Sequence, residues 1–140
     1  MVFGGINIWI ANTFDDSLIK LSPGGKGPSA LAFDGEHIWV TDFIGNSVSK
    51  LDQNGLVLDT VVVGQAQEAV VSDCASIWVT NSESGDITRI RMNDSAHLGT
   101  YQARDRPLAI AFDGQYIWVA DFNQDTVTRI SWFPVPVDPK

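Results

Sequence analysis

The chain has 140 residues, a formal net charge of −8, and 44% hydrophobic residues. This composition is too apolar for a disordered chain, and the acidic balance argues against nucleic acid and anionic membrane surfaces as partners. A single cysteine, Cys74, excludes an intrachain disulfide and a cysteine-cluster zinc site. No apolar run reaches the roughly 18 residues of a membrane span, and the N-terminus lacks the basic leader of a signal peptide. We expect a soluble domain, cytoplasmic if the chain is complete, whose compartment is otherwise unknown.

An Ile-Trp-aliphatic triad occurs four times, with its tryptophans at Trp9, Trp39, Trp78 and Trp118. Successive tryptophans are separated by 30, 39 and 40 residues, and the flanking sequence aligns on them. Residues 28–35 match residues 107–114, and residues 67–74 are a more divergent copy. Self-similarity at a fixed period is the sequence signature of a repeat architecture.

Each full repeat predicts four short strands, called A to D here. In the second repeat, strand A covers residues 30–33 and strand B residues 38–41, while strand C covers residues 47–51 and strand D residues 56–63. Strand B has no polar alternation, so both of its faces should be buried. Four-stranded sheets repeated about every 40 residues are the pattern of β-propeller blades. We expect an all-β chain, 1–140, forming one half-ring domain of antiparallel blades at about 1–27, 28–66, 67–106 and 107–140.

The repeat has a recognisable pattern: Pro-x-Ala-[Ile/Leu]-Ala-Phe-Asp-Gly, then Ile-Trp-Val-[Ala/Thr]-Asp, then Val-[Ser/Thr]-[Lys/Arg]-[Ile/Leu]. From residue 3 to about residue 130 it resembles NHL and YVTN-type propeller repeats and is similar to those of streptogramin lyase-like proteins. The resemblance implies a ring of blades that binds proteins or ligands. Streptogramin lyases use a histidine and acidic residues around magnesium near the axis. His37 and His97 are not expected on that face, so no catalytic residue is transferred.

The length supplies only about 3.5 blades at about 40 residues each. Seven residues separate Lys20 from Pro28, whereas sixteen separate Lys50 from Gln67, so the first blade should lack strand D. An open arc exposes apolar blade faces, which favours a homodimer that completes a seven- or eight-blade ring. A four-bladed monomer and a piece of a longer protein are the alternatives. The candidate interface residues are Met1, Val2, Phe3, Trp132 and Phe133, the last two of which could instead pack on their own blade.

One face of the expected ring collects the loops between strands B and C and the loops between strand D and the next strand A. The predicted ligand-binding residues on it are Asn12, Lys26, Asp42, Phe43, Asn81, Arg104, Arg106, Asp121 and Phe122, with Asp105 beside them. Asp42 and Asp121 could hold Mg²⁺ or Ca²⁺, because hard cations prefer oxygen ligands. The alternative is that this recurring Asp or Asn caps its own turn.

Two other charged positions recur in the repeat. We expect the strand-C cations to be solvated, with stems covering apolar surface; they are Lys20, Lys50, Arg89 and Arg129. We expect the acidic residues between strands A and B to be turn formers; they are Asp34, Asp73 and Asp113.

These observations favour a non-enzymatic binding or interaction module without a cofactor. It would self-associate and bind an unidentified small molecule or protein on its polar face. The alternative is a lyase or lactone hydrolase of streptogramin lyase-like type, which would depend on a divalent cation at Asp42 and Asp121. Neither interpretation requires a nucleic acid or a membrane.

Overall fold

A computed structural model describes residues 2–4, 7–12, 17–21 and 27–131, the first three segments as backbone alone. The described residues form strands and one 3₁₀ turn, η1 (Phe122–Gln124). The strands are β1 (Val2–Gly4), β2 (Asn7–Asn12), β3 (Ser17–Leu21), β4 (Pro28–Phe33), β5 (Ile38–Asp42), β6 (Ser47–Leu51), β7 (Val57–Val62), β8 (Gln67–Ser72), β9 (Ser76–Asn81), β10 (Asp86–Arg91), β11 (His97–Gln102), β12 (Pro107–Phe112), β13 (Ile117–Asp121) and β14 (Thr126–Ile130).

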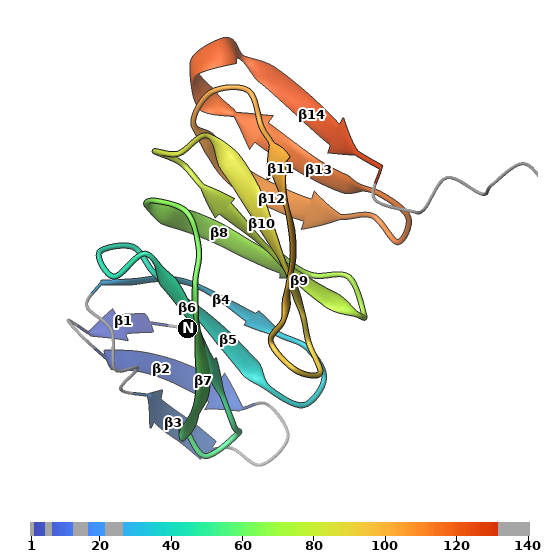
Figure 1. Cartoon of the computed structure of the whole chain (residues 1–140). Helices are drawn as coiled ribbons and strands as arrows, with labels where there is room; N and C mark the ends of the chain where they lie inside the picture. The colour runs from blue at the N-terminus through green and yellow to red at the C-terminus, as the bar shows by residue number, and fades with distance from the viewer. Residues whose placement is uncertain (1, 5–6, 13–16, 22–26, 132–140) are drawn as a thin grey trace, which may run out of the picture.

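The strands form four antiparallel sheets in which chain neighbours pair: β1-β2-β3, β4-β5-β6-β7, β8-β9-β10-β11 and β12-β13-β14. The sheets follow one another along the chain, as blades 1 to 4 (Figure 1). The first sheet has three described strands, as the short first repeat predicts. The predicted all-β fold of propeller-like blades is therefore confirmed. In the described part of the chain, no helix has the length and apolar character needed to span a membrane.

Strand A is the position at which successive blades approach one another. The Ser29 hydroxyl in β4 donates a 2.7 Å hydrogen bond to the carbonyl oxygen of Gln67 in β8, which joins blades 2 and 3. The A strands of blades 2, 3 and 4 all carry a register shift at the same place, directly after Pro28, Gln67 and Pro107. Because the bulge recurs at the same position in all three blades, it is a regular feature of the repeat.

The blades stack through a repeated seam between two unlike sides of the sheet. We call them the Trp side, which carries the strand-B tryptophan, and the Ile side, which carries the isoleucine before it. In the first seam, Trp39 and Val48 of blade 2 cluster with Ile77, Val79 and Ile90 of blade 3. All five side chains are at most 1% exposed, and burying each contributes about 2 kcal/mol.

The second seam repeats the arrangement between blades 3 and 4. Trp78 and Ile87 of blade 3 cluster with Ile117, Val119 and Ile130 of blade 4. The two seams enclose both sides of β9, which explains why it is buried at every position. The strand β5 is also buried at every position, as predicted for strand B, with its Trp side in the first seam. In β13 burial alternates, because only its Ile side faces a neighbouring blade.

In each described A–B turn, one aspartate accepts hydrogen bonds both from the turn backbone and from the strand-B tryptophan. Oδ1 of Asp73 accepts the backbone N–H groups of Ala75 and Ser76, and its Oδ2 accepts the Trp78 indole N–H at 2.7 Å. The same indole contact, also at 2.7 Å, recurs between Asp34 and Trp39 and between Asp113 and Trp118. The predicted turn-forming role is confirmed, and the contact with tryptophan adds to it.

The prediction of solvated strand-C cations is wrong for Lys50. Lys50 is 7% exposed, its Nζ lies 5.3 Å from the centre of the Trp39 ring, and it donates a 2.6 Å hydrogen bond to the carbonyl oxygen of Met92 in the next blade. Arg89 is half-buried over Trp78, whereas Arg129 is exposed over Tyr116. The difference arises because the seam encloses the Trp side of blades 2 and 3.

Candidate functional site

The B–C loops and the D–A loops form one surface, as the sequence predicts. Phe43 donates its backbone N–H to the Gly27 carbonyl at 2.9 Å, and Ser82 donates to the Ala66 carbonyl at 2.8 Å. Phe122 makes the same contact with the Arg106 carbonyl at 3.1 Å. We call this surface the loop face; it comprises residues 43–46, 63–66, 82–85, 103–106 and 122–125.

Two predicted ligand-binding carboxylates are buried and hydrogen-bonded within the chain. Asp42 is 5% exposed, and its Oδ1 accepts the Gly45 backbone N–H at 2.9 Å. Asp121 is 2% exposed; its Oδ1 accepts the Arg104 backbone N–H at 3.1 Å and its Oδ2 accepts the Thr128 hydroxyl at 2.6 Å. Both carboxylates therefore stabilise neighbouring loops, which agrees with the alternative that the recurring Asp or Asn has a structural capping role.

The equivalent residue in blade 3, Asn81, is fully buried. Its Nδ2 donates to Oδ1 of Asp86 at 2.7 Å and to the Thr88 hydroxyl at 2.9 Å, and its Oδ1 accepts the side-chain N–H of Gln67 at 3.1 Å. Its polar atoms thus already have partners inside the blade. The Asn12 side chain, Lys26, Met1, Trp132 and Phe133 lie outside the described residues, as do the side chains of Val2 and Phe3.

The strand-B ends offer a divalent cation few free oxygen ligands. Asp42 and Asp121 end β5 and β13 of blades 2 and 4, and both carboxylates already accept hydrogen bonds within the chain. Within residues 27–131, no group of three or more His, Cys, Asp or Glu side chains is placed to hold a metal ion.

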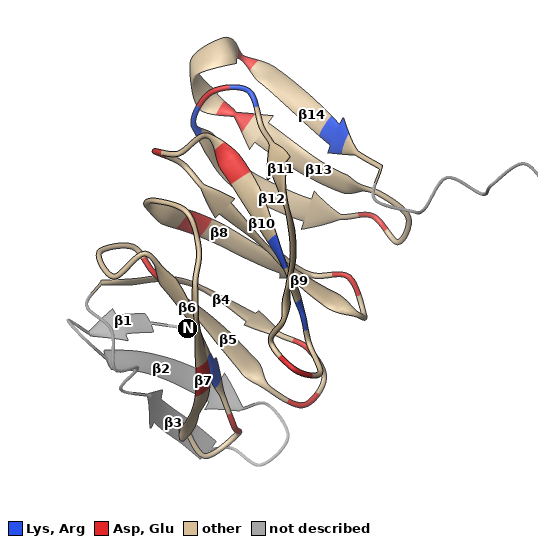
Figure 2. Ribbon diagram, viewed as in Figure 1, with Lys and Arg blue, Asp and Glu red and all other residues tan. Residues whose placement is uncertain are grey.

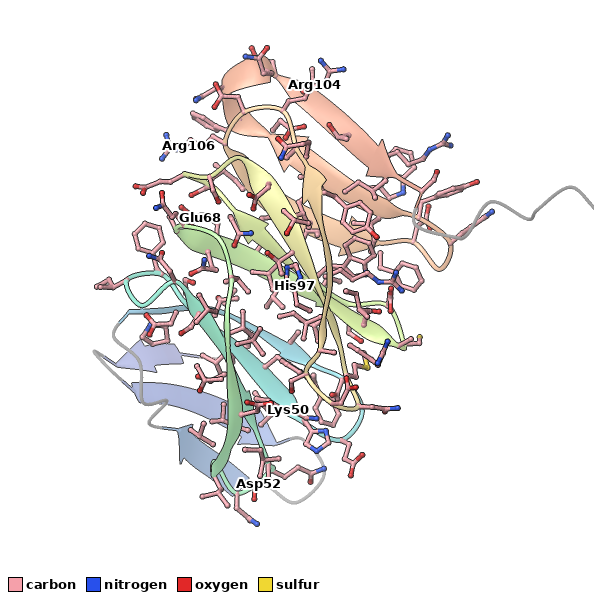
Figure 3. All side chains as sticks on the ribbon, viewed as in Figure 1. Lys50, Asp52, Glu68, His97, Arg104 and Arg106 are labelled. Carbon is pink, nitrogen blue, oxygen red and sulfur yellow. The ribbon has the colours of Figure 1, made fainter. Side chains whose placement is uncertain are left out.

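The loop face contains a shallow hollow of about 280 Å³. It is lined by Phe43, Glu68, Ser82, Glu83, Asp105, Arg106 and Asn123, which come from blades 2, 3 and 4 and the loop before blade 4. Figure 2 shows acidic and basic residues side by side in the loop between β11 and β12, and Figure 3 shows Glu68 and Arg106 near one another. Phe43 and Arg106 were predicted as ligand-binding residues, and Asp105 was placed beside them.

Sequence reasoning missed four of the lining residues, Glu68, Ser82, Glu83 and Asn123. A signal for the two glutamates was available, because both depart from the repeat. In the alignment, Glu68 occupies the position of Ser29 and Leu108, and Glu83 that of Ile44 and Asn123. A residue used in only one blade is not needed to build every blade.

The lining of the hollow is acidic and polar, and exposed apolar side chains lie on the same loop face. The lining includes three carboxylates and one guanidinium, that of Arg106, which lies 5.4 Å from the centre of the Phe122 ring. The Ser82 hydroxyl donates to the Ala66 carbonyl at 3.0 Å. At the loop tips, Phe43, Ile44 and Phe122 are 39%, 66% and 61% exposed. The arrangement suits a ligand that brings positive charge and an apolar flank.

Neither histidine lines this hollow. Nδ1 of His37 lies 3.5 Å from Oδ2 of Asp34 in the A–B turn. His97 is exposed on the edge strand β11, where its ring contacts the Thr100 hydroxyl. Cys74 is exposed in another A–B turn.

The fold and the site define a chain of propeller-like blades with a polar hollow on its loop face. Among solved structures, the chain is similar to hydrazine synthase from Kuenenia stuttgartiensis, with a TM-score of 0.64 and 21% sequence identity. The match covers 76% of this chain and 36% of that chain, and it supports the β-propeller-like fold alone. No family model and no curated protein sequence matches. The resemblance to NHL, YVTN-type and streptogramin lyase-like repeats therefore stays a prediction.

Proposed function

We propose that the chain is a non-enzymatic binding module that self-associates and uses the hollow of its loop face to bind a cationic segment of a partner protein. The observation that carries the proposal is the composition of the hollow. Its acidic lining residues, Glu68, Glu83 and Asp105, are not the residues that recur in every blade to hold the loops.

Electrostatics supports a cationic ligand. The lining supplies three carboxylates against one guanidinium, and the whole chain carries a formal net charge of −8. Acidic surfaces raise the association rate of basic partners, and the effect weakens as salt screens the charges. A partner's lysine or arginine would also satisfy carboxylates that are half-buried or exposed in the free chain.

The exposed apolar side chains of the loop face support a peptide segment as the ligand. Phe43 lines the hollow, Phe122 contacts the lining residue Arg106, and both rings are exposed, as is the side chain of Ile44. A basic residue flanked by apolar residues would place its charge against the carboxylates and its neighbours against these apolar side chains. Aromatic anchors around a polar centre are common where proteins bind one another.

The proposal is tested by calorimetric titration with a synthetic penta-lysine peptide, compared with penta-glutamate. We expect binding of the basic peptide only, with an affinity that falls as salt is added. The double variant Glu83→Gln/Asp105→Asn should weaken binding about tenfold, which corresponds to about 1.4 kcal/mol.

The matched control is Glu36→Gln, because Glu36 is exposed in an A–B turn, away from the loop face. It also removes one negative charge, and the affinity should change little. If the control weakens binding as much as either single change in the hollow, the peptide binds by overall charge and the proposed site is wrong. Equal binding of penta-glutamate would also contradict the proposal.

A further inference from the structure

Among the described residues, no blade stacks on the Trp side of blade 4. Trp118 is 37% exposed, whereas Trp39 and Trp78 at the same position are fully buried. Val127 is 66% exposed, whereas its equivalents Val48 and Ile87 are fully buried. Ala120 and Arg129, which share this side with them, are exposed as well.

The two described seams show what the Trp side of a blade packs against. In both, the Trp side of one blade meets the Ile side of the next, made by an Ile-x-Val pair in strand B and an isoleucine in strand C. Repeat proteins bury each unit on its neighbours through the same contact. The occupant of the blade 4 side should therefore be the Ile side of another blade.

Blade 1 carries an Ile side with the required register. In the backbone, Ile8 pairs with Leu21 and Ile10 pairs with Ile19. The same pairing joins Ile117 with Ile130 and Val119 with Thr128 in blade 4, whose Ile side is buried in the second seam. In both described seams the Ile side meets the Trp side of the preceding blade, so the Ile side of blade 1 is the counterpart in register for the Trp side of blade 4.

The Ile side of blade 1 is more apolar than the other Ile sides. Ile19 occupies the position of Ser49, Thr88 and Thr128. An isoleucine in place of a hydroxyl side chain suits a side that is buried against another blade. On the Trp sides, Ala120 matches Ala11, whereas Thr41 and Thr80 stand at the same position in blades 2 and 3.

We infer that the Trp side of blade 4, formed by Trp118, Ala120, Val127 and Arg129, binds the Ile side of blade 1 in a second copy of this chain. The inference rests on the self-association in the proposed function and assigns its interface. Two identical joints related by a two-fold axis would close a ring from two chains. These residues differ from the interface residues predicted from the sequence, which are Met1, Val2, Phe3, Trp132 and Phe133.

The test is the mass of the full chain and of Val127→Glu by light scattering at micromolar concentration. The unaltered chain should have twice the 15.3 kDa of one copy, and Val127→Glu should weaken dimerisation at least about tenfold, because a buried carboxylate would be unpaired. Leu56→Glu is the matched control, since Leu56 is 64% exposed but lies in a C–D turn. It should remain a dimer.

A mixing experiment separates a broken joint from a broken fold. Ile10→Glu alters the other side of the same joint, so a mixture with Val127→Glu contains one intact and one doubly altered joint per pair. The mixture should recover dimers that neither variant forms alone. A monomeric unaltered chain, a dimer that tolerates Val127→Glu, or a mixture without recovery would each overturn the inference.

Penta-lysine binding distinguishes this inference from the proposed function. The hollow lies within blades 2 to 4 of one chain, so monomeric Val127→Glu should bind the peptide as the unaltered chain does. If the Glu83→Gln/Asp105→Asn variant loses peptide binding but keeps the mass of a dimer, the result supports the binding site in the hollow and leaves the dimer interface unaffected.

Discussion

The indole N–H of Trp78 donates a 2.7 Å hydrogen bond to Oδ2 of Asp73, and both side chains are buried between blades 3 and 4. The other oxygen of the carboxylate closes the A–B turn. A single side chain therefore sets the turn and fixes the ring that fills the seam. The same pair in blades 2 and 4 makes this contact part of the repeat.

Asp73→Ala should destabilise the chain strongly. The substitution leaves three N–H donors without an acceptor, those of Ala75, Ser76 and the Trp78 indole. We expect a loss of about 3 kcal/mol in the free energy of unfolding, measured by urea titration. Asp59→Ala, at an exposed position whose carboxylate accepts only the neighbouring Thr60 N–H, should cost less than about 0.5 kcal/mol. Equal losses would contradict a structural role for the Asp–Trp pair.

Stability should fall in acid through the same carboxylates. Burial raises the pKa of Asp34, but hydrogen bonds from the Trp39 indole and from the backbone of His37 and Glu36, with the charge of His37, lower it below its ordinary value. Hydrogen bonds from Tyr116, Trp118 and Gln115 likewise lower the pKa of Asp113.

A pKa that is lower in the folded state gives stability that is present above the unfolded value, about 3.9, and is lost as the pH falls through the folded value. The melting temperature should therefore decline below about pH 4. Asp113→Asn should make that decline shallower in calorimetric scans. An identical acid slope in the variant would show that this carboxylate does not couple folding to pH.

Lys50→Met tests the polar contact that crosses the first seam. The substitution keeps a long apolar stem but removes the donor to the Met92 carbonyl, which we expect to cost about 1–3 kcal/mol. Arg91→Met is the comparison, because the Arg91–Asp94 ion pair has side chains 50% and 55% exposed. Such a pair contributes at most about 1 kcal/mol. A larger loss in Arg91→Met than in Lys50→Met, measured by urea titration, would contradict the seam contact.

Asp121→Ala and chelation together test the role of the strand-B ends. The variant loses the acceptors of the Thr128 hydroxyl and the Arg104 N–H, which should cost about 2 kcal/mol. Addition of EDTA or Mg²⁺ should leave the melting temperature of the unaltered chain unchanged. A drop in melting temperature with EDTA would favour the divalent-cation alternative.

The repeat makes most of the fold predictable. The tryptophan spacing and the Asp-Gly turns locate the strands to within two residues in the second blade, where β6 has its predicted bounds and β4 begins two residues early, at Pro28. The three described strands of blade 1 agree with the short spacing between Lys20 and Pro28, which leaves room for no fourth strand. These features depend on local turns and on the pattern of apolar residues, both of which a sequence displays.

The hollow and the burial of Lys50 depend on how blades meet, which a linear pattern does not display. Lys50 occupies the same repeat position as Arg129, yet Lys50 is enclosed and Arg129 is exposed, because blade 2, unlike blade 4, has a described blade stacked on its Trp side. Glu68 and Glu83 come together with Asp105 through the loops of adjacent blades. The sequence marks Glu68 and Glu83 only by their difference from the residues at the equivalent positions of the other repeats.

The central claim is that blades stack Trp side on Ile side and that this contact continues between two copies of the chain. The most direct test is the mass of the unaltered full chain in solution, measured by light scattering over a range of micromolar concentrations. We expect a particle with twice the mass of the 15.3 kDa chain. A particle with the mass of one chain throughout that range would contradict it.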